Sequence, residues 1–215
     1  APEDYTEINL QERHREPVWL DRDEGVGLLG TDGIGRDIAS GIILGSRISM
    51  LVGVSVSLLY VVLNIGPGLV AAYYGGWVDD IIMRFSDMNA ALPPLVLLLA
   101  VMAFLGQGVM NLIIFFGISA ALSASRVTRG EVFRAKNMEY VLAARSVGMG
   151  DIRIMLRHIM PNVMAPVIVG ITLGFGWIIL AEASLSYLGF GANPNEPSWG
   201  RMLADARDNI LFSWA

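Results

Sequence analysis

The chain has 215 residues, of which 54% are hydrophobic and only 16% are charged, and its formal net charge is −5. Because soluble globular domains carry about 25% charged residues, this composition favours a chain that lies largely in a lipid bilayer. Cysteine is absent, which excludes disulfides and thiolate metal ligands from these residues. The chain starts at Ala1 with no cationic region before a short apolar core, so we predict no signal peptide and expect a processed or partial chain.

Residues 1–46 are polar and contain ten acidic and four basic side chains, which predicts a loop outside the lipid. Residues 25–30 (GVGLLG) match the spacing of a dinucleotide-binding turn, but no convincing strand precedes them and no acidic ribose partner follows. Asp21, Asp23 and Asp32 resemble part of a calcium loop, yet the bidentate glutamate of such a loop is missing. A solvated acidic loop accounts for both patterns better.

Four apolar segments follow this loop, and each is a candidate membrane span. A helix needs about 20 residues, at about 1.5 Å rise per residue, to cross a hydrocarbon core roughly 30 Å thick. The third candidate is the weakest, because it is short and contains Asn111. The sequence predicts an all-α integral membrane protein with spans at about residues 48–74, 88–106, 109–124 and 163–188.

The connector from Ser125 to Met160 carries seven basic and three acidic residues. An excess of Lys and Arg in a short loop marks the cytoplasmic side of a membrane protein. Alternation from that anchor places residues 75–87 inside the cell, and residues 1–46 and 189–215 in extracytoplasmic loops. An acidic outer segment needs a helix upstream to carry it across, so we expect a preceding membrane helix, and the apolar end of RDNILFSWA favours another downstream.

The second half of the cytoplasmic loop, residues 125–161, is predicted to contain two short helices joined by a glycine turn. Tyr140 and Ala144 repeat at helical spacing, and Gly148 and Gly150 suit the left-handed turn that commonly ends a helix. The first helix is therefore expected to end close to Gly148.

The second helix of the loop is expected to be capped by Asp151 and to end at Pro161. An apolar stripe runs along it, formed by Ile152, Met155, Leu156 and Ile159. An amphipathic helix of this kind needs an apolar partner, either a groove in another protein or the membrane surface. Periodicity alone favours neither partner.

The segment EYVLAARSVGMGDIRIMLRHIMPN resembles the EAA loop of ABC importer permeases, whose pattern is E-A-A-x-x-x-G followed at a fixed interval by I-x-L-P. Ala143, Ala144, Gly148 and Pro161 stand at matching positions. The Glu, Ile and Leu positions of the pattern are occupied by Leu142, His158 and Met160.

Five further stretches, in order from about Leu29 to the C-terminus, are similar to the second permease subunit of the dipeptide/oligopeptide family. They are LGTDGIGRDIASGIILGSRISMLVG, AAYYGGWVDDIIMRFSDMNAALPPL, SRVTRGEVF, LAEASLSYLGFGA and PSWGRMLADARD. This resemblance implies the fold of a type I ABC importer transmembrane domain, of whose six spans four are present and the first and last are missing. It also implies that the loop is a coupling helix-turn-helix that docks into a groove of a separate ATPase. The residues to which the coupling role carries over are Tyr140, Leu142, Ala143, Ala144, Gly148, Gly150, Asp151, Ile159 and Pro161.

The resemblance further implies a permease subunit that moves dipeptides, oligopeptides or similar small solutes across a bacterial or archaeal cytoplasmic membrane. Its expected partners are a second permease subunit in a heterodimer, two cytoplasmic ATPase subunits, an extracytoplasmic solute-binding protein and membrane lipid, but no nucleic acid. ATP and Mg are expected on the ATPases and no cofactor on this chain, because its only lysine, Lys136, lies outside any Walker A pattern. No covalent chemistry and no catalytic residue are expected.

Two more groups of residues are candidates for function. The outer segments are expected to meet the solute-binding protein, with contacts at Asp32, Arg36, Asp37 and Trp199. Glu182 is an ionisable residue toward the outer end of the fourth span. A hydrogen bond across helices, or exposure near the interface, is favoured there over substrate binding.

Two other classes of protein compete with the importer. An ion-gradient-driven transporter or channel needs charged residues deep in its spans, and only Glu182 comes close. An integral membrane enzyme needs a nucleophile with its base or a metal site. His14 and His158 lie on opposite sides of the membrane in the predicted topology, which argues against a metal site built on both.

Overall fold

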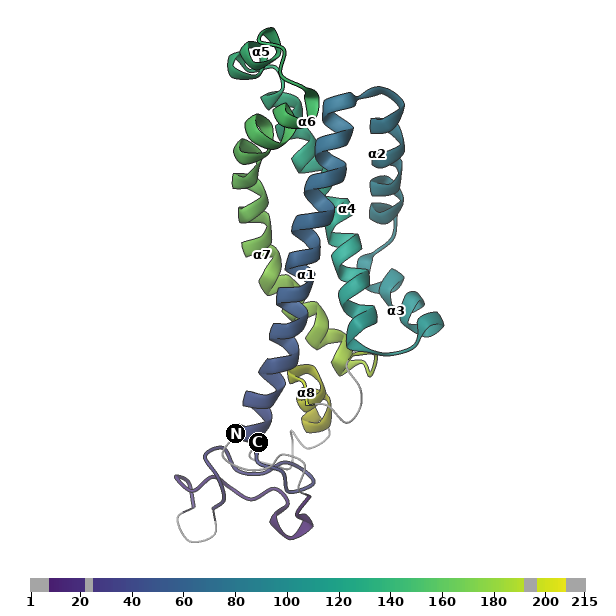
Figure 1. The fold of residues 1–215 in the computed structure, drawn as a ribbon. Coiled ribbons are helices and arrows are strands. Elements are labelled where there is room, and N and C mark those ends of the chain that lie inside the picture. Colours follow the sequence, from purple (N-terminus) through teal and green to yellow (C-terminus); the bar gives the residue numbers. More distant parts are fainter. Residues whose placement is uncertain (1–7, 22–24, 192–196, 208–215) are drawn as a thin grey trace. The chain divides into compact units, whose positions relative to one another are not determined.

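The computed structural model describes residues 8–21, 25–191 and 197–207, and these form helices and loops with no strand among them. Besides a single 3-10 turn at Leu10–Glu12, the chain forms the helices shown in Figure 1. They are α1 (Ile38–Tyr74), α2 (Gly76–Ala91), α3 (Pro94–Leu105), α4 (Val109–Ala135), α5 (Glu139–Ser146), α6 (Asp151–Ile154), a π-helical turn (Met155–Ile159), α7 (Met160–Tyr187) and α8 (Trp199–Arg207). The predicted all-α fold is confirmed.

The long apolar helices agree with the predicted spans in place but differ in their ends. Within the described residues, three helices are long and apolar enough to cross a membrane, and the bent pair of α2 and α3 would make a fourth span. Helix α1 begins at Ile38 rather than residue 48, because Asp37 precedes it and its carboxylate accepts a hydrogen bond from the Ser40 backbone at 2.8 Å. Helix α4 continues past residue 124 to Ala135.

Residues 88–106 do not form the single helix that a straight span requires. Helix α2 ends at Ala91, α3 begins at Pro94, and the two are bent by 91°. Two prolines cause the break, since neither offers a backbone donor and the residue before a proline avoids helical angles. Leu92 is accordingly extended, with φ −110° and ψ 141°. Helix α3 alone, with 12 residues, is about 18 Å long and too short to cross.

The chain divides into two compact units. Unit 1 contains residues 1–53, 105–112 and 179–215, and unit 2 contains residues 54–104 and 113–178. In unit 1, α8 packs closely on the end of α7, since a Cβ added to Gly200 would meet the Ala183 carbonyl oxygen at 2.0 Å. Trp199 of α8 also donates its indole N–H to the Ile42 carbonyl of α1 at 3.0 Å.

In unit 2, a seam of polar contacts joins α2 to α4. Arg129 pairs with Asp79 at 2.5 Å, and Arg126 pairs with Asp87 at 2.7 Å. Further along the same helices, the Ser86 hydroxyl donates to the Leu122 carbonyl at 2.8 Å. Two of the basic residues of the predicted cytoplasmic loop are thus paired with acidic residues of the segment 75–87, which the predicted topology also places inside the cell.

Candidate functional site

The predicted glycine turn after α5 is confirmed. Gly148 has a φ of +77°, a left-handed value that favours glycine. Its N–H donates to the Arg145 carbonyl at 2.9 Å, and the Met149 N–H donates to the Ala144 carbonyl at 3.1 Å. This pair of bonds is the Schellman arrangement, which satisfies the free carbonyls at the end of a helix.

Asp151 does not cap α6, so that prediction is wrong. The N-cap is Gly150, with an extended backbone and no side-chain cap, and Asp151 is the first residue inside the helix. Its carboxylate instead accepts a hydrogen bond from the Tyr73 hydroxyl at 2.5 Å. The loop is therefore bonded to α1, a helix far away in sequence.

Pro161 does not end the second helix, so that prediction is also wrong. Helix continues without a break from Asp151 to Tyr187. The π-helical turn Met155–Ile159 ends two residues before the proline, and the Met160 N–H donates to the Met155 carbonyl five residues back. Wide turns of this kind accommodate a missing backbone donor. The second helix of the loop is consequently an extension of α7.

The apolar stripe predicted along this helix is divided by the fold. Met155 and Ile159 are buried, whereas Ile152 is 67% and Leu156 is 52% exposed. The buried pair belongs to a core cluster with residues from α1, α4 and α5. Its members are Leu69, Ala72, Tyr73, Val132, Ala135, Val141, Ala144, Ile154, Met155, Ile159 and Val163. The loop thus has an apolar partner inside its own chain, and only part of the stripe remains for another protein or for lipid.

Burial separates the predicted coupling residues into two groups. Ala144 and Ile159 are buried, which leaves little of them for direct contact with a partner, and their coupling role stays a prediction. The remaining seven have exposed side chains or backbone: Tyr140, Leu142, Ala143, Gly148, Gly150, Asp151 and Pro161. Val147, Ile152 and Leu156 are exposed apolar residues that the prediction left out of the coupling set. We refer to Tyr140, Leu142, Ala143, Val147, Ile152 and Leu156 as the exposed apolar set.

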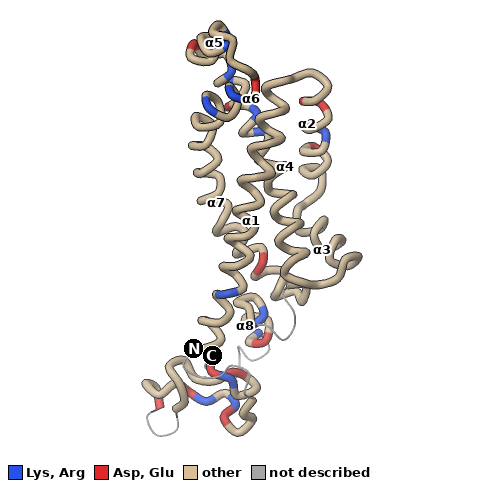
Figure 2. The backbone as a smooth tube through the Cα atoms, viewed as in Figure 1, with Lys and Arg blue, Asp and Glu red and all other residues tan. Residues whose placement is uncertain are grey.

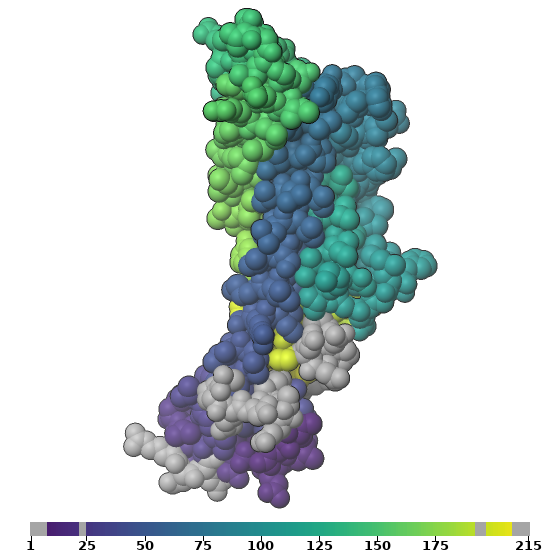
Figure 3. Space-filling model, viewed as in Figure 1, coloured from purple at the N-terminus to yellow at the C-terminus, as the bar shows by residue number. Residues whose placement is uncertain are grey.

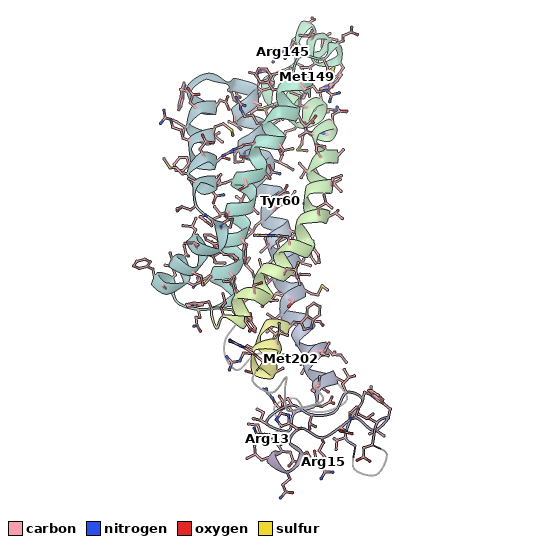
Figure 4. The ribbon with its side chains drawn as sticks, turned by 180° about the vertical axis from the view of Figure 1, so that it is seen from behind. Arg13, Arg15, Tyr60, Arg145, Met149 and Met202 are labelled. Carbon is pink, nitrogen blue, oxygen red and sulfur yellow. The ribbon has the colours of Figure 1, made fainter. Side chains whose placement is uncertain are left out.

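The surroundings of α6 are basic and hollowed. A groove of about 800 Å³ runs beside the helix, with Ile152 and Leu156 among its apolar residues and Arg153 and Arg157 among its charged ones. Figure 2 shows basic residues gathered around α5 and α6. Figure 4 places Arg145 and Met149 at this end of unit 2. The site can hold a partner through apolar contacts with cations at the edge, and it presents no arrangement for bond chemistry.

The four residues predicted to contact an outer partner all have roles inside unit 1. Arg36 donates to the Asp32 carboxylate at 2.8 Å and lies 3.6 Å from Asp205 of α8. Asp37 caps α1 and is only 5% exposed. Trp199 joins α8 to α1 through its indole hydrogen bond. Asp32, Arg36 and Trp199 stay partly exposed, and contact with a partner remains a prediction for all four residues.

Glu182 is fully buried in unit 1, which excludes exposure at a membrane interface. Its carboxylate accepts hydrogen bonds from Ser49 of α1 at 2.8 Å and from Ser186 of α7 at 2.7 Å. The favoured alternative, a hydrogen bond across helices, is confirmed. A space-filling view of the chain is given in Figure 3.

Comparison with known proteins identifies relatives over most of the chain. A family model described as binding-protein-dependent transport system inner membrane component matches residues 64–214. The chain is 41% identical over 198 residues to the di/tripeptide transport system permease protein DppC of Pseudomonas aeruginosa, covering 92% of this chain and 65% of the relative. It is 39% identical over 185 residues to the glutathione transport system permease protein GsiD of Pectobacterium atrosepticum, covering 86% and 62%.

A third relative, the dipeptide transport system permease protein DppC of Haemophilus influenzae, is 40% identical over 207 residues, covering 96% of this chain and 70% of the relative. The chain thus spans less than two thirds of the length of the first two relatives. Among solved structures, an amino acid ABC transporter matches with a TM-score of 0.55 at 16% identity, covering 82% of this chain and 79% of the other.

The structural match supports the fold of a type I ABC importer transmembrane domain, and the apolar helices support a multi-pass membrane protein. The family model covers more than half of the chain, and the relatives agree with it. The chain therefore belongs to the family of binding-protein-dependent transport system inner membrane components.

Proposed function

We propose that the chain is a permease subunit of an ATP-driven, binding-protein-dependent importer in a bacterial or archaeal cytoplasmic membrane. The observation that carries this proposal is the exposed apolar set, of which Ile152 and Leu156 lie on the helix that continues without a break into the apolar helix α7. Membrane segments of this kind can transmit the movement of a cytoplasmic partner. Two of the relatives are named for dipeptides or tripeptides and one for glutathione, so the proposed cargo is a short peptide or a similar small solute.

Two ATPase subunits are the proposed partners of the cytoplasmic loop, and they would bind ATP and Mg. The proposed contacts are the exposed apolar set together with Gly148, Gly150, Asp151 and Pro161. Ala143 and the two glycines leave room for the close approach of another backbone. Arg153 and Arg157 border the groove and offer charged contacts at its rim.

ATP binding by this chain itself is not part of the proposal. Its single lysine, Lys136, lies in the turn between α4 and α5, and its ammonium donates a hydrogen bond to the Ala72 carbonyl at 2.6 Å. A second permease subunit would complete the transport path as a heterodimer, and an extracytoplasmic solute-binding protein would deliver the cargo. Asp32, Arg36 and Trp199, which are partly exposed in unit 1, remain candidates for that outer contact.

The alternative of an ion-gradient-driven transporter depends on Glu182, and the surroundings of this residue do not favour it. A carboxylate on an ion path needs access to the ion, whereas Glu182 is sealed from solvent and both its oxygens accept hydrogen bonds from serines. A buried interhelical hydrogen bond accounts for the residue without transport of an ion.

Reconstitution of the full-length chain with its partner subunits in liposomes tests the proposal. With the binding protein outside and ATP on the ATPase side, we expect uptake of radiolabelled dialanine or glutathione that stops when ATP is omitted. Uptake that follows an imposed proton or sodium gradient without ATP would instead support the ion-driven alternative.

A further inference from the structure

Three segments of the cytoplasmic loop contact the last turn of α1. The Tyr73 hydroxyl donates to Asp151 of α6 at 2.5 Å, and the guanidinium of Arg145 on α5 lies 5.3 Å from the centre of the Tyr73 ring. Lys136, just after α4, donates to the Ala72 carbonyl at 2.6 Å. Three separate segments of the loop thus converge on two neighbouring residues of one helix.

Tyr73 is part of the core cluster and is only 8% exposed. Apolar contacts within such a cluster are non-directional, so they constrain the register of two packed helices less sharply than a hydrogen bond does. A hydrogen bond requires a defined distance and angle. The Tyr73–Asp151 bond is therefore the contact in this cluster that fixes the register of α6 against α1.

A second buried bond holds α1 further along its length. The Thr128 hydroxyl of α4 donates to the Asn64 side-chain oxygen at 2.8 Å, and both residues are about 1% exposed. Between Asn64 and Tyr73, helix α1 contains Gly66, Pro67 and Gly68, where the proline removes one backbone hydrogen bond. The end of α1 that is bonded to the loop is thus separated from the Asn64 contact by a locally weakened stretch of helix.

We propose that the Tyr73–Asp151 hydrogen bond transmits movement of the docked loop to α1, which makes Tyr73 a positioning residue for the coupling of ATP hydrolysis to transport. The inference rests on the proposed function. Asp151 begins a helix that is continuous to Tyr187, so a partner that displaces α6 also moves α7. The same displacement moves α1 through the hydrogen bond between Asp151 and Tyr73. Two membrane helices then respond to one docking event.

Tyr73→Phe removes the hydroxyl but keeps the ring in the core cluster and under the Arg145 guanidinium. In the reconstituted complex with ATP, binding protein and radiolabelled dialanine, we expect the variant to hydrolyse ATP while transport per ATP falls about fivefold, the factor corresponding to one ordinary hydrogen bond. Its amount in the membrane should equal that of the unchanged protein. Tyr60→Phe is the matched control, since Tyr60 lies on the same helix and no hydrogen bond of its hydroxyl occurs among the described residues.

Asp151 supplies a second arm of the experiment. Asp151→Asn keeps an oxygen that can accept from Tyr73 and should retain most of the transport per ATP, whereas Asp151→Ala should lose at least as much as Tyr73→Phe. Because both changes break the same bond, the double variant Tyr73→Phe with Asp151→Ala should lose no more than Asp151→Ala alone. A purely structural role predicts instead a loss of inserted protein and no rescue by Asn.

The outcomes separate the inference from the proposed function. Failure of the unchanged complex to import with ATP overturns the proposed function and the inference with it. An active complex whose Tyr73→Phe variant keeps the normal ratio of transport to ATP overturns the inference alone. Should Tyr73→Phe fail to reach the membrane, the Asp151 variants decide, and a normal ratio in Asp151→Ala refutes the inference.

Discussion

Two carboxylates join α1 to the helix that runs from Asp151 to Tyr187, and their surroundings differ. Glu182 in unit 1 is fully buried, and both its oxygens accept hydrogen bonds from serines of the same chain. Asp151 in unit 2 bonds to Tyr73 but is itself exposed, at the start of α6 and beside the exposed apolar set. A buried hydrogen bond such as that of Glu182 holds two helices together. A hydrogen bond at an exposed edge, such as that of Asp151, can also respond to a protein that docks beside it.

The largest expected effect is on the free energy of unfolding, after substitution of the buried Glu182. Glu182→Ala removes the acceptor of two buried hydroxyls, and buried donors without acceptors are costly, so we expect the free energy of unfolding in detergent micelles to fall by about 3 kcal/mol. Ser184→Ala is the matched control, because the exposed Ser184 hydroxyl bonds only its own helix, at the Leu180 carbonyl. That variant should stay within about 0.5 kcal/mol of the unchanged protein. Equal stability of the two variants would remove the distinction drawn between the carboxylates.

A large effect on coupling, without one on insertion, is expected for Gly148→Trp. No atom lies within 4 Å of a Cβ added at Gly148, so the side chain would project from the loop and obstruct a docked partner. We expect binding-protein-stimulated ATP hydrolysis to fall more than about tenfold, with normal amounts of protein in the membrane. Gly148→Ala carries the backbone strain of the left-handed conformation without the bulk and should lose less. Normal coupling in Gly148→Trp would contradict docking at this turn.

A smaller effect is expected from Ile152→Ser in the exposed apolar set. Ile152 is 67% exposed, so the substitution should leave the free energy of unfolding nearly unchanged. Affinity for the ATPase subunit, measured by fluorescence titration in detergent, should fall about fivefold as apolar contact is lost. Ile152→Leu retains the apolar area and serves as the control. A loss of stability with unchanged affinity would show that the residue supports the fold instead.

The smallest effects on the free energy of unfolding are expected from the two serines that donate hydrogen bonds to Glu182. Ser186→Ala removes one hydroxyl but leaves the carboxylate bonded to Ser49, so the expected cost in unfolding free energy is about 1 kcal/mol. Ser49→Ala should cost a similar amount and should also loosen α1 from α7, since Ser186 lies on the same helix as Glu182. Denaturation in detergent micelles measures both. A Ser186→Ala effect as large as that of Glu182→Ala would mean that the two bonds do not act separately.

The sequence predicted the elements whose signals are local. The apolar segments located α1, α4 and α7, and the glycine after α5 located the turn, because a left-handed φ is accessible mainly to glycine. The family resemblance was carried by short stretches in a fixed order, and the comparisons confirm it. Helix ends were less accurate, as α1 and α4 show, since hydropathy marks the apolar middle of a helix rather than its capped or polar ends.

Tertiary contacts decided the rest. Periodicity predicted one stripe of Ile152, Met155, Leu156 and Ile159, but only the position of α1 and α4 determines that Met155 and Ile159 are buried. The same applies to Asp151, whose residue type suits a cap and whose partner is Tyr73, 78 residues away. Pro161 is accommodated because a π-helical turn precedes it, and nothing in the local residue pattern signals that turn. The sequence determined which segments are helical and apolar, because those properties are summed along the chain, whereas the partners of each side chain depend on distant residues that meet only in the fold.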